Sequence, residues 1–260
     1  MANFDLVWAY RHAPAVIDAW QHWAPQGADE LSADLVLTAA ADPASEPFAE
    51  VYGALIGSDR DARELLQELV ARVGSDPTSE DCRELSYLDT CAYQAERSVA
   101  YDQIEGTRRR QGYRSTKSEF FARPLPREAI AALVETFAEL PVLAQTRSVG
   151  FAPWGGAYNR RSAQATAFPH RDQLFVLEHL VLVDPSAPDS ERRAAREWVT
   201  RSWACVHGWG SGRVYPCFPD PDLSDWGHAY YGENYPRLLA VKSRYDPDNV
   251  FRSKQSLPLR

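Results

Sequence analysis

Predicted strands and amphipathic helices alternate at the start of the chain, and this order restricts the fold more than any other feature of the sequence. Strand-like apolar runs and helically spaced apolar side chains follow one another with Gly, Pro and capping residues between them. The order strand, helix, strand, strand, helix predicts an α+β fold, a large antiparallel sheet with helices packed on one face. The strands are predicted at residues 4–10, 31–39 and 51–56, and the helices at 16–23 and 59–73.

The pattern fades and then returns further along the chain. Residues 75–114 contain Pro77, Gly106 and Gly112, which predicts mostly loop with a short helix at 90–94. The last strand of the following part is long and rich in β-branched residues, which is typical of a central strand. Helices are predicted to begin at Pro126 and to span 190–203, and strands to span 114–121, 146–151, 164–168 and 174–183.

Composition and charge exclude several classes of protein. The 260 residues are 45% apolar and 25% charged, enough for a hydrophobic core, and the net charge of −8 argues against nucleic-acid or anionic-membrane partners. Apolar runs such as 180–183 are too short for a membrane helix, and the N-terminus has no basic region typical of a signal peptide. We therefore expect a cytoplasmic protein.

The four cysteines show no metal-binding spacing. Cys82, Cys91, Cys205 and Cys217 form no C-x-x-C pair and have no histidines placed as in zinc sites, so we expect no metal. Reduced thiols are the expectation for a cytosolic protein, although Cys82 and Cys91 could form a disulfide in an oxidising compartment.

The last quarter of the chain carries the most specific pattern. It predicts a strand, a glycine turn and a helix, with Asn234 as helix cap, Pro236 in the first turn and a stop at Asp246-Pro247. The string Y-Y-G-E-N-Y-P-R-L…V-K…Y-D-P-D-N-V-F…Q-S-L-P closely resembles the C-terminal segment of the berberine-bridge-enzyme-like flavoprotein oxidases. Upstream, the resemblance extends to Trp154-Gly155-Gly156, to Phe168-Pro169-His170-Arg171 and to Lys117-Ser118-Glu119-Phe120.

The resemblance covers essentially the whole chain and corresponds to the second half of the family. It implies the substrate (cap) domain of the vanillyl-alcohol-oxidase-like architecture at 1–212, with a berberine-bridge-like segment at 213–260 packed on it. FAD is the implied cofactor. In the family an N-terminal domain holds most of the flavin, and we expect this chain to lack it. No glycine-rich phosphate loop occurs in the sequence, so tight FAD binding is expected only with a separate FAD-binding domain or chain.

Two catalytic candidates follow from the resemblance. Relatives use a tyrosine on a Y-x-N strand as the base, or its assistant, for a substrate hydroxyl, and Tyr215 matches it, with Cys217 in place of the asparagine. A phenol acts as a base only if a neighbour lowers its pKa from about 10. Glu178 alternates with Leu177 on an apolar strand, where relatives carry polar groups that point at the substrate, and is an acid/base or orienting candidate. The alternatives are an ordinary strand tyrosine and an edge-exposed glutamate, and His179 is expected to make a structural contact.

Four further residues are implied around the flavin and the substrate. Tyr231 and Asn234 are cofactor-facing candidates, with sheet packing and helix capping as the alternatives. His170 and Arg171 are substrate-binding candidates that could clamp a carboxylate, although the family keeps this element mostly for structure.

The predicted function is the substrate-binding part of an FAD-dependent oxidoreductase that oxidises a hydroxyl-bearing small molecule by hydride transfer to flavin. The alternative is a free-standing, flavin-independent binding protein derived from that domain. Association with a second copy of the chain is left open.

Overall fold

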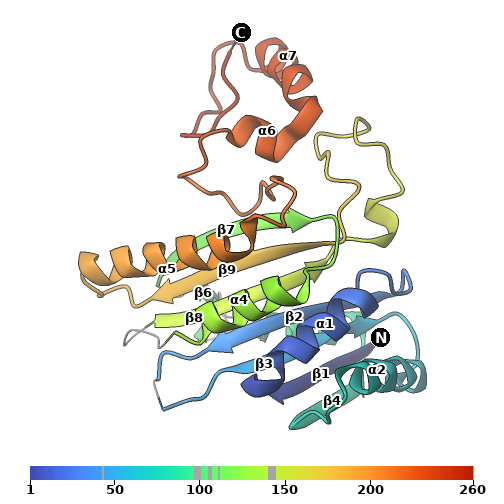
Figure 1. The fold of residues 1–260 in the computed structure, drawn as a ribbon. Coiled ribbons are helices and arrows are strands. Elements are labelled where there is room, and N and C mark those ends of the chain that lie inside the picture. The colour runs from blue at the N-terminus through green and yellow to red at the C-terminus, as the bar shows by residue number, and fades with distance from the viewer. Residues whose placement is uncertain (43, 97–100, 105–106, 111, 140–144, 260) are drawn as a thin grey trace.

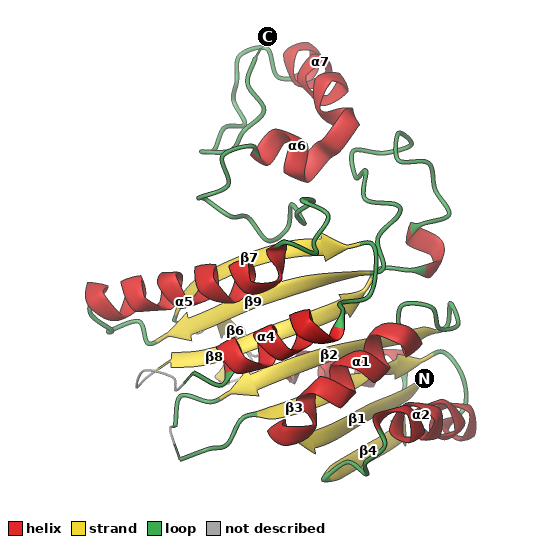
Figure 2. Cartoon of the chain, viewed as in Figure 1, coloured by secondary structure: helices red, strands yellow, loops and turns green. Residues whose placement is uncertain are grey.

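Most of the chain forms one large antiparallel sheet with its main helices on one face, while the helix at 87–96 contacts the other face through the hydrogen bond from Asn3 to Thr90 (Figures 1 and 2). The structure, a computed structural model, describes all residues except 43, 97–100, 105–106, 111, 140–144 and 260, and no side chains of 95–96, 101–104 and 107–110. The strands are β1 (Ala2–Ala9), β2 (Leu31–Ala39), β3 (Phe48–Leu55), β4 (Ser79–Glu84), β5 (Tyr101–Ile104), β6 (Thr107–Arg110), β7 (Tyr113–Phe121), β8 (Gln145–Pro153) and β9 (Phe175–Val183). The α-helices are α1 (Ala13–Trp23), α2 (Asp59–Val73), α3 (Tyr87–Glu96), α4 (Arg127–Phe137), α5 (Asp189–His207), α6 (Trp226–Tyr231) and α7 (Tyr235–Tyr245).

The sheet has seven strands in the order β4-β1-β3-β2-β8-β9-β7. All of its pairings are antiparallel, so the predicted fold class is confirmed. β9 lies between β8 and β7 and is buried along its length apart from Glu178, as its apolar sequence predicts. β5 and β6 form a separate two-stranded sheet.

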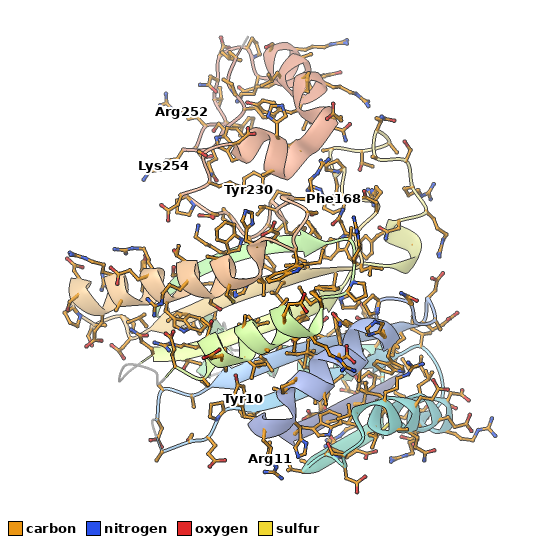
Figure 3. All side chains as sticks on the ribbon, viewed as in Figure 1. Tyr10, Arg11, Phe168, Tyr230, Arg252 and Lys254 are labelled. Carbon is orange, nitrogen blue, oxygen red and sulfur yellow. The ribbon has the colours of Figure 1, made fainter. Side chains whose placement is uncertain are left out.

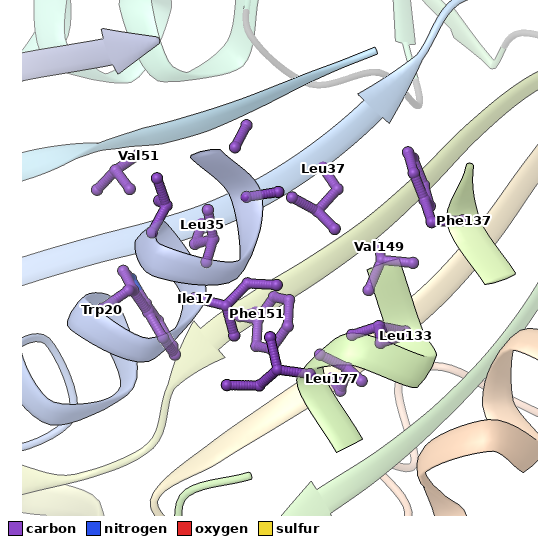
Figure 4. Close-up of a cluster of buried hydrophobic side chains, with 14 of the residues drawn as sticks. Ile17, Trp20, Leu35, Leu37, Val51, Leu133, Phe137, Val149, Phe151 and Leu177 are labelled. Atoms are coloured by element: carbon purple, nitrogen blue, oxygen red, sulfur yellow. The ribbon is translucent and has the colours of Figure 1, made fainter. Parts of the chain in front are cut away.

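The hydrophobic core lies between the sheet and helices α1, α2, α4 and α5, which Figure 1 shows on one face. Trp20 of α1 is fully buried, and its ring contacts Phe151 and Phe175 edge-on at centroid distances of 5.7 and 5.9 Å. Its indole N–H donates to the carbonyl of Ala33 at 2.9 Å, so the one polar atom of the side chain is also satisfied. Figure 4 shows Trp20 and Phe151 together with Leu35 and Leu177 in this layer.

Local sequence fixes the helix ends. Ser58 caps α2 in a capping box, since its hydroxyl accepts from the Asp61 N–H and the Asp61 carboxylate accepts from the Ser58 N–H. Gly74 ends the helix with φ 75°, a conformation that glycine adopts without steric cost. Both ends agree with the prediction.

The C-terminal part lies beyond the β7 edge of the sheet. It is joined to that edge through Phe120, whose N–H donates to the Arg213 carbonyl at 2.8 Å and whose carbonyl accepts from the Ser211 N–H at 2.9 Å. Figure 3 labels Tyr230 and Lys254 in this part, far from Tyr10 at the opposite end of the molecule. The proposed boundary between 212 and 213 stays a prediction.

Several local predictions are wrong. Residues 164–168 and Tyr215 were predicted to be in strands and lie in loops. In contrast, β4 and the β5–β6 pair occur in the segment that was predicted to be mostly loop. β4 was missed because it is a polar edge strand, whose residues are half-buried or exposed and therefore show no apolar alternation. Among the described residues, no helix has the length and apolar character needed to cross a membrane.

Candidate functional site

The face of the sheet opposite α1, α2, α4 and α5 carries the polar residues of the strands. Side chains alternate along a strand, so the neighbours of core residues such as Leu35, Val51 and Leu177 point to this second face. We call it the substrate face. From β3 to β7 it includes Glu50, Tyr52, Asp34, Val36, Ser148, Gly150, Ala152, Val176, Glu178, Arg114, Thr116, Ser118 and Phe120.

Glu178 lies at the centre of β9 and is held by two donors from β7. Its Oε1 atom forms an ion pair with the Arg114 guanidinium and accepts from the Thr116 hydroxyl at 2.8 Å. The side chains of Arg114 and Glu178 are only 18% and 20% exposed, so water screens this pair less than a surface pair. Within the described part of the chain, Oε2 accepts no hydrogen bond and is available to a ligand.

His179, the next residue, points to the opposite face. It is fully buried, and its Nδ1 lies 2.8 Å from the Ser202 hydroxyl of α5. Burial lowers the pKa of His179 to about 3, so the ring is neutral at physiological pH. This contact is the structural role that alternation predicts, and β9 is an inner strand, so Glu178 is not an edge-exposed residue.

A second acidic group occupies the substrate face on β2. Asp34 lies directly opposite Tyr52 in the β2–β3 register, and the two side chains are hydrogen bonded. Burial raises the pKa of Asp34 to about 7, although the Tyr52 hydroxyl partly opposes this rise. The pKa of Tyr52 is raised first by burial and then by the negative charges of Asp34 and Glu178. Tyr52 therefore lies within electrostatic reach of both carboxylates.

The strand between the two carboxylates carries only small side chains on this face. β8 separates β2 from β9. Gly150 of β8 lies directly opposite both Glu178 of β9 and Val36 of β2, and Ala152 is the next β8 residue on this face. A molecule resting on this part of the sheet would therefore meet a polar side chain on either side of a nearly bare strand.

Aromatic rings border Glu178 on one side. Phe120 of β7 contacts the rings of Trp154, Phe168, His170 and Tyr215 at centroid distances of 5.0, 6.2, 4.8 and 6.2 Å. Phe120 and Val176 of this cluster are on the substrate face, each two residues along its strand from Ser118 and Glu178 respectively. The structure thus brings the predicted residues Tyr215 and His170 to the end of the face that carries Glu178.

Tyr215 is poorly suited to act as a base. Its hydroxyl is hydrogen bonded to Cys217, and this bond, burial and the charges of Cys217 and Tyr158 raise the pKa of Tyr215 to about 12. Among the described residues, no lysine or arginine lowers the pKa of Tyr215. A phenol in this environment keeps its proton and donates hydrogen bonds. The catalytic role of Tyr215 stays a prediction, and the geometry favours a donor.

His170 and Arg171 support the loop before β9. His170 is buried, and burial and the Arg213 charge lower its pKa to about 4. Arg171 donates to the Tyr158 carbonyl at 3.2 Å and to the Thr166 hydroxyl at 2.9 Å, and its guanidinium lies over the Phe168 ring. Substrate binding by this pair stays a prediction, while these contacts agree with the structural role.

The two cofactor-facing candidates lie in the C-terminal part. Asn234 is buried and donates from Nδ2 to the carbonyls of Ala163 and Thr166 at 2.6 and 3.0 Å, rather than capping α7 with its side chain. Tyr231 ends α6 half-buried, and burial raises its pKa. Their cofactor role stays a prediction.

Sequence reasoning missed Asp34, Tyr52, Arg114 and Thr116. Asp34 had a detectable signal, because it interrupts an apolar strand in the way that Glu178 does. Arg114 and Thr116 share the face of Glu178 only because β7 pairs with β9 in a particular register, which a single sequence does not reveal. All four cysteines are free thiols. The described residues contain no group of three or more His, Cys, Asp or Glu arranged to hold a metal ion.

Known proteins are similar to this chain in sequence and in fold. The profile of the family described as Berberine and berberine like matches residues 214–258. The uncharacterized FAD-linked oxidoreductase YgaK of Bacillus subtilis is 29% identical over 255 residues, which cover 98% of this chain and 52% of YgaK. This chain is related to the berberine bridge enzyme-like FAD-linked oxidoreductases. Monolignol oxidoreductase AtBBE-like 13 of Arabidopsis thaliana is 24% identical over 263 residues, which cover 92% of this chain and 47% of that protein.

Solved structures of the family have the same fold. BBE-like 28 of Arabidopsis thaliana superimposes with a TM-score of 0.83 at 21% identity, covering all of this chain (100%) and 56% of that protein. A variant of berberine bridge enzyme in complex with (S)-reticuline gives a TM-score of 0.81 at 20% identity, covering 100% of this chain and 55% of that protein. The chain thus spans about half the length of its berberine bridge enzyme-like relatives and corresponds to their substrate-binding portion.

The described residues do not form a site for the phosphates of FAD. The Gly155-Gly156 pair is the nearest sequence match to a phosphate loop, but Gly155 packs against backbone, since a Cβ there would lie 2.0 Å from the Pro25 carbonyl oxygen. Asn234 has already committed its amide donor to protein carbonyls. The part of the chain that the structure describes therefore fits the substrate side of a flavoenzyme site and not the cofactor-holding side.

Proposed function

We propose that this chain forms the substrate-binding half of an FAD-linked oxidoreductase that oxidises a hydroxyl group of a small molecule, with Glu178 as the base. The observation that carries the proposal is the anchoring of Glu178 Oε1 by Arg114 and Thr116, which leaves Oε2 without a hydrogen-bond donor among the described residues. A general base must be fixed within hydrogen-bond reach of the proton that it removes. Two donors on one oxygen meet this requirement and keep the other oxygen available.

The residues around Glu178 assign the remaining roles. Glu178 Oε2 takes the hydroxyl proton of the substrate, and Arg114 keeps the carboxylate oriented through its ion pair. Tyr215 retains its proton in the hydrogen bond with Cys217 and contributes its ring to the aromatic cluster beside the substrate. The aromatic rings of Phe120 and Trp154 favour an apolar or aromatic body beside the reacting hydroxyl. When bound by residues outside the described site, FAD supplies the acceptor of the two electrons.

The relatives narrow the choice of test substrates. One relative is named a monolignol oxidoreductase, and one solved structure holds (S)-reticuline. Monolignols combine an aromatic ring with an alcohol, which matches the aromatic cluster next to Glu178. We therefore propose aromatic alcohols as the first substrate class to assay.

The test supplies the flavin-binding half of a relative in trans. The purified chain is mixed with FAD and with the half of YgaK that this chain does not match, and the visible spectrum is recorded before and after anaerobic addition of a monolignol. We expect a yellow complex whose flavin band bleaches with substrate. Glu178→Gln should slow bleaching by about 10²–10⁴-fold, the usual contribution of a general base. Glu80→Gln, the same substitution on the exposed edge strand β4, is the matched control and should leave the rate unchanged.

Two results would contradict the proposal. A yellow complex that bleaches equally fast with Glu178→Gln would show that Glu178 is not the base. A mixture that binds an aromatic alcohol but never acquires flavin, with this half and with the corresponding half of another relative, would favour a flavin-independent binding protein.

A further inference from the structure

We propose that Asp34 and Tyr52 form a second acid–base pair on the substrate face, which receives the proton that Glu178 removes from the substrate. This inference rests on the function proposed above. It concerns what happens to the proton after the substrate has been oxidised, because Glu178 must lose that proton before it can act as a base again.

Asp34 and Tyr52 are neighbours on the substrate face. Asp34 and Tyr52 face each other directly across β2 and β3, and their side chains are hydrogen bonded, so the carboxylate fixes the direction of the hydroxyl. Tyr52 feels the charge of Glu178 as well as that of Asp34. The negative charges of both carboxylates therefore act on the Tyr52 hydroxyl.

Strands β8 and β2 form the surface between Glu178 and Tyr52. β2 and β9 flank β8, so their backbones are two strand spacings, or about 10 Å, apart. Tyr52 lies one strand further from Glu178, on β3. Gly150 of β8 lies directly opposite Glu178 and has no side chain, and Val36 of β2 lies on its other side, with its Cγ2 3.9 Å from where a Cβ at Gly150 would be. A proton that moves from Glu178 to Tyr52 therefore passes over β8 and Val36 through a chain of water molecules.

The hydrogen-bond partner of Asp34, the Tyr52 hydroxyl, is unusual for a partly buried carboxylate. A partly buried carboxylate normally has a cationic partner, as Glu178 has Arg114. No lysine or arginine is bonded to Asp34 among the described residues, and its partner is a neutral hydroxyl. Its pKa of about 7 lets Asp34 both accept and release a proton near neutral pH.

The proposed transfer is balanced in atoms and charge. The protonated Glu178 carboxyl loses its O–H bond, and its proton reaches the Tyr52 oxygen through a chain of water molecules, each of which accepts one proton and gives one up. At the same time the Tyr52 O–H bond breaks, and its proton forms a new O–H bond on the Asp34 carboxylate. Glu178 returns to the carboxylate, Tyr52 is unchanged, and Asp34 releases the proton to solvent. No electron is transferred in this step.

The first measurement uses the chain alone. Carboxyl carbons of aspartate are labelled with carbon-13, the Asp34 signal is assigned by its loss in Asp34→Asn, and its chemical shift is followed against pH. We expect a midpoint near 7, and a higher midpoint in Tyr52→Phe because the hydroxyl that lowers the pKa is gone. Titration near the ordinary value of about 3.9, unmoved by Tyr52→Phe, would overturn the inference.

The second measurement separates this inference from the proposed function. In the complex with the flavin-binding half, the first bleaching of the flavin reports substrate oxidation, whereas kcat also includes proton release. We expect Asp34→Asn and Tyr52→Phe to lower kcat about 10-fold or more, with the first bleaching changed less than about twofold. Asp34→Glu should restore part of kcat. Asp5→Asn is the matched control, because Asp5 faces Tyr52 from β1, on the side away from Glu178.

The outcomes are distinguishable. If Glu178→Gln leaves the first bleaching unchanged, the proposed function fails. If Glu178→Gln abolishes it while Asp34→Asn and Tyr52→Phe leave kcat unchanged, only the inference about Asp34 and Tyr52 fails. If Asp34→Asn slows the first bleaching as much as kcat, Asp34 acts during substrate oxidation and the proton-receiving role is overturned.

Discussion

Replacing Asp34 with asparagine should make the folded chain more stable at alkaline pH. Burial raises the pKa of Asp34 from 3.8 to about 7, so the folded state binds this proton more tightly than the unfolded state. Between these two pH values the folded protein therefore loses stability as the pH rises, and the loss is complete above pH 7. Asparagine keeps the shape and an oxygen acceptor for Tyr52 but carries no charge, so Asp34→Asn removes this loss.

The magnitude follows from the shift. About three pKa units correspond to about 4 kcal/mol at most, since one unit is about 1.4 kcal/mol. Asp34 is only partly buried, and water screens part of its charge. We therefore expect Asp34→Asn to raise the free energy of unfolding by about 1–2 kcal/mol at pH 8 and by close to zero at pH 4.

Urea unfolding of both proteins from pH 4 to pH 8 tests this expectation. The difference between the two curves isolates Asp34, because other titrating groups contribute equally to both proteins. His170 and His179, for example, have lowered pKa values, so they add stability above their unfolded pKa of 6.5 that is lost as the pH falls. A difference that is constant across this pH range, or that favours the wild type at pH 8, would refute the reasoning about the environment of Asp34.

Three further expectations concern other parts of the molecule. Trp20→Ala should lower the free energy of unfolding in urea by about 3–5 kcal/mol, because it removes a fully buried ring and its bond to Ala33; a loss under about 1 kcal/mol would contradict this account of the core. Cys217→Ala should lower the pKa of Tyr215 from about 12 toward about 10, measured by carbon-13 NMR of the tyrosine ring, and an unchanged value would show that Cys217 does not hold Tyr215. Asp246→Ala should speed amide hydrogen exchange at Val250 and Phe251, whose N–H groups donate to its carboxylate at 2.7 and 3.1 Å; unchanged protection would disprove that tie.

The sequence pattern predicted the layered architecture because burial enforces it. The helix that begins after Ser58 and ends at Gly74 has its caps and its apolar stripe in the sequence, and β9 is almost uniformly apolar because all of its residues except Glu178 are buried. Predictions failed where a segment is shaped by distant partners. Residues 164–168 contain an apolar-polar alternation, yet their backbone is held as a loop by Asn234, whose amide bonds to Ala163 and Thr166.

The candidate site was predictable only in part, for the same physical reason. A single acidic residue in an apolar strand is visible in the sequence, and Glu178 was found in this way. Its partners were not, because Arg114 and Thr116 reach it through the β7–β9 register and Asp34 shares its face through two intervening pairings. Strand register over long separations depends on loop lengths and core packing, which the local pattern does not contain.

The two carboxylates of the substrate face differ mainly in their partners, and this difference can divide the work of an oxidation between them. Glu178 is paired with a cation that fixes its position, which suits a group that must be placed to receive the first proton. Asp34 faces a neutral hydroxyl in a setting that stabilises its protonated form, which suits a group that receives the proton afterwards. Two titratable groups on one surface in such different environments are typical of sites that divide acid and base roles between them.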